Sequence, residues 1–390
     1  MTRKTTIAET NLSIYTDYSL QLNRWILKPI GVWPAFSTTT RLERIVSIIL
    51  NVICYGSMMS MSILSLLQLL LEKETSYTKL KIGAALTHWF TSSFTYTSLL
   101  LRSKDILLCV QHMDNDWRAV RRKQDQEVML ENAKFGRYVA TFCVAFMQGG
   151  ILSAVFVIVQ TMEEIQVGNE TRIVHMMITP VYKKLVNVDE SPMNEIILSV
   201  QIFSIFIANS STVGTFSLAA VLAAHACGQL GVLMLRINES MNASRDQKET
   251  INFVSNTEEV MNKMYFLELF RCMLDICLLG YLTLADLAED NIQSAVTLFA
   301  CVLSICFNVF IMCYIGETLT EQCKKVGEVV YMTNWYYLPD KLILDLILII
   351  VRSNVVIDIT AGKIVHLSIY TFGQVIKTSF AYLNVLRQMM

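Results

Sequence analysis

Long apolar blocks alternate with polar segments along the whole chain. Each of seven blocks has the length of a membrane-spanning helix, because about 20 apolar residues in a helix cross the roughly 30 Å hydrocarbon core of a bilayer. The pattern therefore predicts an all-α, polytopic membrane protein with seven transmembrane helices. These helices are expected at about 45–71, 82–101, 138–161, 196–223, 266–285, 293–316 and 364–386.

A further apolar run, LILDLILIIV at 342–351, is shorter than the others. Asp345 interrupts it, and Asp340, Lys341 and Arg352 bracket it. It is too short to cross a bilayer, so we expect a buried or interfacial helix there.

The connections between the blocks differ strongly in positive charge. Alternate connections, starting with the N-terminal segment, hold 23 lysines and arginines, and the other three hold six. Because positively charged connections stay in the cytosol, the N-terminus is expected inside and the C-terminus outside. This orientation is opposite to that of a G-protein-coupled receptor. The glycosylation sequence at Asn169 falls in the third connection between helices, which is expected outside.

Composition agrees with a membrane protein and excludes several classes. Hydrophobic residues make up 53% of the chain and charged residues 17%, against about a quarter charged in average soluble domains. The net charge of −1 gives no reason to expect a nucleic-acid partner. Most of the ten cysteines lie in apolar blocks and none lies between 163 and 195, so buried thiols are expected in place of disulfides or a metal site. No apolar run follows Arg3 and Lys4 closely, so we expect no signal peptide.

Several short motifs follow one another near the C-terminus. They are YMTNWYYLP at 331–339, Arg352-Ser353, TAGK at 360–363, and the tyrosine, lysine and serine spacing of the last apolar block; LNRWILKPIGVWP at 22–34 adds to them. In this order they resemble the insect odorant receptor family, and the front end is similar to its Hymenopteran members. Gustatory receptors share the architecture but differ in the C-terminal pattern.

The resemblance implies a ligand-gated, non-selective cation channel that passes monovalent cations and calcium. Family members assemble as heterotetramers with a shared co-receptor subunit, in the plasma membrane of olfactory neuron dendrites. A small volatile or lipophilic odorant binds each subunit, and no cofactor is implied. The implied division is a cytosolic segment at 1–44, an odorant-binding bundle at 45–316, a cytosolic anchor at 317–363 with helices at 317–330 and 340–352, and a pore helix at 364–390.

The last apolar block is unusually polar for a spanning helix. Ionisable residues within the membrane usually face a bundle interior or water, and a pore would supply that water for Lys377. The alternative is that Lys377 extends to the interface or pairs locally. By resemblance, Val385, Gln388 and Met389 correspond to a hydrophobic gate, and the chain is expected to end at the outer pore mouth. Subunit contacts are expected from Trp335, Tyr336, Leu344 and Leu348.

Candidates for odorant contacts are the aromatic, small and apolar residues in the expected outer halves of the helices. For each of them plain packing is the commoner role, although the adjacent Gly149 and Gly150 allow close approach. The candidates are His88, Trp89, Ser92, Met147, Gly150, Ile151, Ala154, Phe203, Phe206, Ile207, Leu278 and Tyr281.

Other readings of the sequence receive less support. Arg271 and Asp275, four residues apart near the expected cytosolic end of the fifth block, suggest a local salt bridge. No phosphate-binding loop, zinc-protease motif or nucleophile elbow appears, so an enzyme is not expected. A gustatory-type channel and a G-protein-coupled receptor remain as alternatives.

Overall fold

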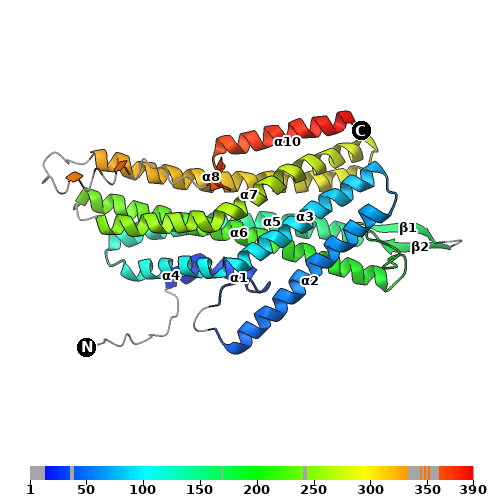
Figure 1. The fold of residues 1–390 in the computed structure, drawn as a ribbon, viewed down its shortest axis with the longest axis horizontal. Coiled ribbons are helices and arrows are strands. Elements are labelled where there is room, and N and C mark those ends of the chain that lie inside the picture. Colours follow the sequence, from blue (N-terminus) through cyan, green and yellow to red (C-terminus); the bar gives the residue numbers. More distant parts are fainter. Residues whose placement is uncertain are drawn as a thin grey trace.

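The protein is an elongated bundle of long helices with two small β-hairpins (Figure 1). The computed structural model describes residues 14–35, 39–167, 170–239, 244–332, 343–344, 347, 350–351 and 360–389. The helices are α1 (Ile14–Leu27), α2 (Arg41–Leu71), α3 (Ser76–Leu101), α4 (Ser103–Ala119), α5 (Lys123–Gln160), α6 (Met193–Glu239), α7 (Ser244–Ala288), α8 (Ile292–Met332) and α10 (Ile369–Met389).

All seven predicted spans coincide with long helices, namely α2, α3, α5, α6, α7, α8 and α10. Within the described residues, α2, α5, α6 and α8 are long and apolar enough to cross a membrane by length and composition alone. The helices α5 to α8 have 38, 47, 45 and 41 residues. Since about 20 residues cross the hydrocarbon core, each extends well beyond it, and the apolar blocks mark only part of each helix.

Helix α6 forms the centre of the bundle, with 78% of its most apolar window buried. It packs against α1, α2, α3, α5, α7 and α8. Small residues permit this close packing: a Cβ added at Gly136 of α5 would lie 2.5 Å from the Cβ of Ala224. By contrast, α2 and α5 bury only 17% and 11% of their windows, so they lie at the periphery.

The structure corrects several details of the sequence analysis. The helix expected at 317–330 is the continuation of α8, and the last helix begins at Ile369 rather than near 364. The residues before it form a hairpin of β3 (Thr360–Ala361) and β4 (Val365–His366). The backbone N–H of Ile369 donates to the Glu317 carboxylate of α8, 2.6 Å away, which fixes where α10 starts.

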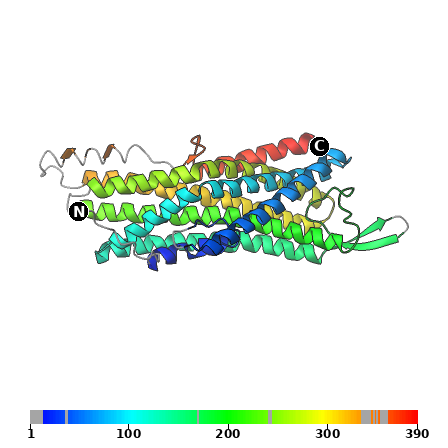
Figure 2. The same ribbon diagram turned by 60° about the horizontal axis from the view of Figure 1, so that its bottom comes forward.

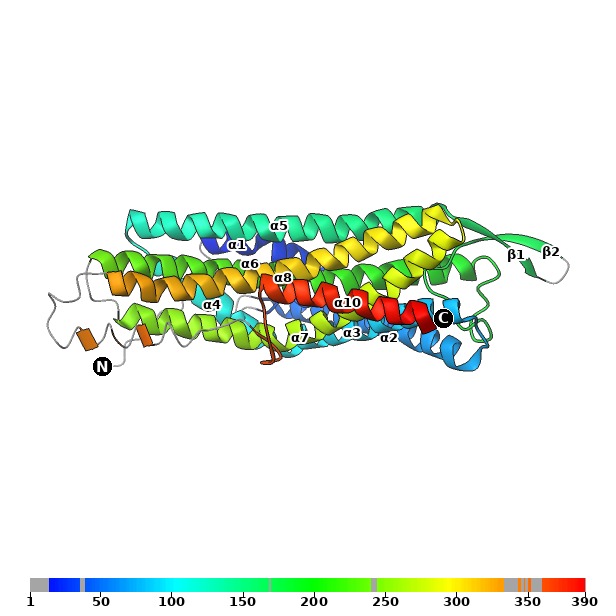
Figure 3. The same cartoon turned by 90° about the horizontal axis from the view of Figure 1, so that it is seen from above.

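Two helices and the longer hairpin were also not predicted. The amphipathic helices α1 and α4 are too polar to form apolar blocks. The antiparallel hairpin of β1 (Met162–Val167) and β2 (Glu170–His175) lies in the third connection and projects beyond one end of the bundle (Figure 3).

Helix α10 lies at the edge of the bundle in both of the first two views (Figures 1 and 2). One face, with Val375, Ser379 and Leu383, is buried where α10 meets α7 and α8. The Ser379 hydroxyl is satisfied within the helix, donating to the Val375 carbonyl at 2.8 Å. Lys377 and Val385 lie on the opposite face and are exposed in the single chain.

Candidate functional site

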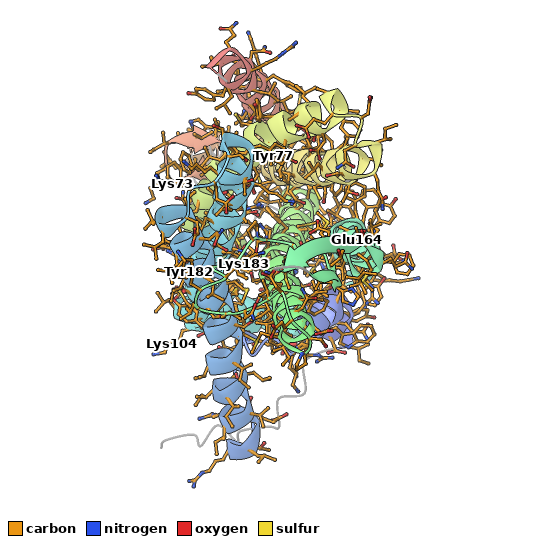
Figure 4. All side chains as sticks on the ribbon, turned by 90° about the vertical axis from the view of Figure 1, so that its right-hand side faces the viewer. Lys73, Tyr77, Lys104, Glu164, Tyr182 and Lys183 are labelled. Carbon is orange, nitrogen blue, oxygen red and sulfur yellow. The ribbon has the colours of Figure 1, made fainter. Side chains whose placement is uncertain are left out.

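A cavity of about 430 Å³ lies among α3, α5, α6, α7 and α8. Its walls come from the start of α3, α6 and α8 and from the later parts of α5 and α7, so it occupies the half of the bundle nearest the β1–β2 hairpin. Ile178 and Thr179 of the connection before α6 also line it. Figure 4 views the bundle from this end, where Tyr77 of α3, Glu164 of β1 and Tyr182 are labelled.

Five of the twelve predicted contact residues line this cavity: His88, Trp89, Gly150, Ile151 and Ala154. Three others, Ser92, Met147 and Ile207, are buried in the core instead. Phe203 and Phe206 are each 43% exposed on the outside of α6. Leu278 and Tyr281 are partly buried on α7 but are not among the lining residues.

On α6 and α7 the predicted residues lie on a different side of the helix from the residues that line the cavity. The cavity face of α6 carries Ile205, Asn209 and Thr212, and that of α7 carries Asp275, Leu279 and Leu282. These spacings of three and four residues define one side of a helix. The predicted residues on α6 and α7 lie one to three positions away from those of the cavity face.

A buried ionic triad stands at the cavity wall. The Arg271 guanidinium donates to Asp275 Oδ2 at 2.6 Å and to Glu268 Oε1 at 3.1 Å, and the Thr87 hydroxyl reaches Asp275 Oδ1 at 3.2 Å. The three ionic side chains are 6% exposed or less. Two carboxylates surround one guanidinium, so the triad has an excess negative charge.

The expected Arg271–Asp275 salt bridge is confirmed, but its environment differs from the expected one. Because α7 begins at Ser244, the pair lies deep inside the helix, and both residues line the cavity. Ionisable residues inside an apolar helix usually mark functional pathways. The position of this pair in an apolar block already indicated a functional role, but the sequence analysis interpreted the pair only as a local salt bridge.

The remaining wall is mostly apolar with a few polar groups. The Asn209 side-chain amide donates to Gln148 Oε1 at 3.0 Å. Asn308 is 5% exposed, and within the described part of the chain its Oδ1 has no hydrogen-bond partner. A concave, mostly apolar space with few orienting polar groups is typical of small-molecule sites.

Other predicted residues lie elsewhere or outside the described part. Val385 is 50% exposed and Gln388 is also exposed on α10, whereas nothing is described of the Met389 side chain. Leu344 is 62% exposed in the single chain. Trp335, Tyr336, Leu348 and Asn169 fall outside the described residues.

Helices that cross a membrane, closed around an apolar cavity, define a multi-pass membrane receptor for small molecules. A family profile described as "7tm Odorant receptor" matches residues 83–380 of the chain. The chain belongs to this odorant receptor family, a family of receptors and not of enzymes.

Curated relatives share short stretches of sequence with the chain. Odorant receptor 83a of Drosophila melanogaster is 23% identical over 34% of this chain and 29% of its own length. Odorant receptor 10 of Aedes albopictus is 25% identical over 37% of this chain and 38% of its own length. The chain thus spans about a third of the length of these relatives in the matched regions.

Solved structures match the fold over nearly the whole chain. The olfactory receptor OR5 from Machilis hrabei superposes with a TM-score of 0.78 at 15% identity, covering 96% of this chain and 100% of that chain. The same receptor in complex with eugenol superposes with a TM-score of 0.76 at 17% identity and the same coverage.

Gly150 and Gly149 provide a matched test of the cavity. A Cβ at Gly150 would lie 3.8 Å from Ser304 Oγ inside the cavity, whereas one at Gly149 would meet nothing within 4 Å. We expect Gly150→Leu to occupy ligand space and raise the half-maximal dose of the larger agonists roughly 5- to 150-fold, the range for 1–3 kcal/mol of overpacking. Gly149→Leu should leave dose–response curves unchanged. Equal curves for the two variants would contradict this assignment.

Proposed function

We propose that this chain is an odorant-binding subunit of a ligand-gated, non-selective cation channel that assembles with a shared co-receptor subunit. The observation that carries the proposal is the separation of two features. A mostly apolar, partly open cavity lies inside the bundle, while α10 presents Lys377, Val385 and Gln388 away from it. Lys377 and Gln388 would be costly against lipid, so this face fits a water-filled pore better than the surface of a receptor that acts alone.

The proposed ligand is a small lipophilic odorant. The cavity has room for a molecule of that kind, since ligand sites of about 300–1,000 Å³ bury most of a drug-sized compound. The structural neighbour from Machilis hrabei binds eugenol, a small aromatic compound. His88, Trp89, Gly150, Ile151 and Ala154 are the contacts we propose from the predicted set.

The outward face of α10 is the proposed pore surface. Lys377, Val385 and Gln388 are separated by eight and three residues, which places them on one side of a helix. In a tetramer, four such faces would meet on one axis. A ring of Val385 and its counterparts would stop monovalent cations and calcium by dewetting, and water in the open pore would hydrate Lys377.

Val385→Asn tests the proposed gate. A polar ring wets more easily, so unstimulated current should rise while surface expression stays normal. Lys104→Gln on α4 is a suitable control, because it changes an exposed polar residue that lies outside both α10 and the proposed anchor segment. Normal basal current, ion selectivity and odorant response in Val385→Asn would remove this face from the pore.

Assembly with a co-receptor is proposed from the resemblance to the family, and its predicted contacts are Trp335, Tyr336, Leu344 and Leu348. The deciding experiment records odorant-evoked current from cells expressing this chain with the co-receptor, the chain alone, or the co-receptor alone. We expect a new odorant response only when the two are together. A response that needs G protein, and not the co-receptor, would overturn the proposal.

Topology separates the channel from a G-protein-coupled receptor. Epitope tags at the two ends should show a cytosolic N-terminus and an extracellular C-terminus in the plasma membrane of the expressing cell, as the charge asymmetry predicts. The measurement is antibody staining before and after permeabilisation. An N-terminal tag that stains on intact cells would contradict the proposed orientation.

A further inference from the structure

A groove of about 1,090 Å³ lies where α1, the turn after it and the start of α2 meet. Its apolar wall includes Ile14, Trp33 and Val46, and its polar wall includes Arg24 and Lys28 of the α1 end. The groove belongs to neither the odorant cavity nor the outward face of α10. Its residues lie before the segment that the family profile matches.

The groove has an excess of positive charge. Arg24 pairs with Asp17 at 2.7 Å, and Lys28 approaches Glu43 at 3.4 Å. Arg41 and Arg44 are exposed and have no carboxylate partner among the described residues. Arg44 lines the groove, and Arg41 lies three residues earlier, on the same side of α2.

Glu43 does not neutralise these two arginines. Its carboxylate accepts a hydrogen bond from the Thr40 backbone N–H at 3.0 Å and lies beside Lys28. The Thr40 hydrogen bond, and then Lys28, lower the pKa of Glu43 below its ordinary value, so it remains ionised and engaged with both groups. Among the described residues, the positive charges of Arg41 and Arg44 beside the groove are therefore not neutralised by a carboxylate.

An exposed apolar face begins directly beside these charges. Leu42, Ile45, Ile48, Ile49 and Val52 of α2 are between 52% and 71% exposed. The start of α2 stands clear of the other helices in two perpendicular views (Figures 1 and 4). A helix with cations at its start and an apolar face one turn further on suits the membrane interface. The cations would lie among the lipid headgroups and the apolar face among the acyl chains.

We propose that this groove binds an anionic glycerophospholipid, with its phosphate at Arg41 and Arg44 and its acyl chains along the apolar face of α2. Arginine forms forked hydrogen bonds to phosphate oxygens, and the apolar face extends the same site toward the hydrocarbon core. The size of the groove suits a headgroup and the beginning of its chains. This site goes beyond the proposed channel function and does not depend on it.

The test measures lipids retained by the purified full-length chain from nanodiscs of phosphatidylcholine doped with phosphatidylserine. Native mass spectrometry of the released protein should show phosphatidylserine retained in preference to phosphatidylcholine. In the double variant Arg41→Gln, Arg44→Gln, the affinity for phosphatidylserine should fall roughly ten- to thirtyfold, since each basic residue near a membrane adds about fivefold.

Two matched variants control for charge and folding. The double variant Lys324→Gln, Lys325→Gln removes two exposed cations from the far end of α8 and should keep the retention unchanged. Arg44→Lys keeps the charge at the groove and should retain most of the phosphatidylserine. An equal loss in the α8 variant would mean non-specific surface attraction and overturn the proposal.

Two further measurements identify the molecule that binds in the groove. Soluble glycerophosphoserine, which lacks acyl chains, should not displace the lipid at equal concentration; if it does, the apolar face has no part in binding and the lipid assignment fails. Deleting residues 2–13 should leave retention at or above the level of the whole chain. A complete loss of retention after that deletion, or no preference for phosphatidylserine in any variant, would also reject the site.

Discussion

Replacing Arg271 by methionine should nearly abolish the folded, surface-expressed receptor. The substitution leaves Glu268 and Asp275 buried together without the guanidinium between them. Breaking a buried ion pair by removing one partner typically costs about 3–5 kcal/mol. The thermal unfolding midpoint of a fluorescently tagged chain in detergent, together with surface labelling of cells, measures this loss.

Two comparisons make the Arg271 result specific. The neutral triple variant Glu268→Gln, Arg271→Met, Asp275→Asn should regain most of the stability, because a matched uncharged set leaves no unpaired charge. Lys183→Met breaks the exposed Lys183–Asp189 pair and should change stability by less than about 1 kcal/mol. If Arg271→Met were as stable as Lys183→Met, the triad would not act as a buried charge cluster.

The second large effect is expected where α7 meets α10. A Cβ added at Gly280 would lie 2.6 Å from Leu383 Cδ1. A branched side chain in Gly280→Val must therefore displace the Leu383 side chain, and we expect this to disturb the packing of α10 against α7. We expect the odorant-evoked current to fall roughly 5- to 150-fold, which corresponds to 1–3 kcal/mol of overpacking.

A compensating substitution tests that contact. Gly280→Val combined with Leu383→Ala gives the new side chain room, so the current should return toward that of Leu383→Ala alone. Gly56→Val on α2 is the matched control, because an added Cβ there meets nothing within 4 Å. Whole-cell currents normalised to surface expression give the result, and a failure of Leu383→Ala to restore current would show that the two helices are not coupled at this contact.

The spanning helices could be predicted from the sequence because a bilayer demands a minimum apolar length. Their ends could not, since the extensions of α5, α7 and α8 are rich in charged and polar residues and leave no apolar block. The start of α10 depends on a hydrogen bond from Ile369 to Glu317, which lies 52 residues earlier. A local signal is also present, because the Ser368 hydroxyl accepts a hydrogen bond from the Thr371 backbone N–H at 3.2 Å and so caps the first turn of α10.

The cavity-lining residues of α3 and α5 could be predicted from the sequence more readily than those of α6 and α7. His88 and Gly150 lie in blocks where polar or small residues already mark one side of the helix. The α6 block is apolar or small all round, so periodicity cannot assign its cavity face. On α7 the strongest marker was Arg271, and its contact with Asp275 was correctly expected while its role at the cavity wall was not.

The helices that form the cavity and the helix with the proposed pore face are almost entirely different. Among the described residues, α10 contributes nothing to the cavity lining, whereas α7 and α8 both line the cavity and pack against α10. Substitutions in the cavity walls of α3, α5 and α6 are therefore expected to act away from the proposed pore face, whereas α7 and α8 also hold α10 in place. Under the proposed channel function, ligand preference can change through the first three helices while the proposed pore face stays the same, and α7 and α8 are constrained by both roles.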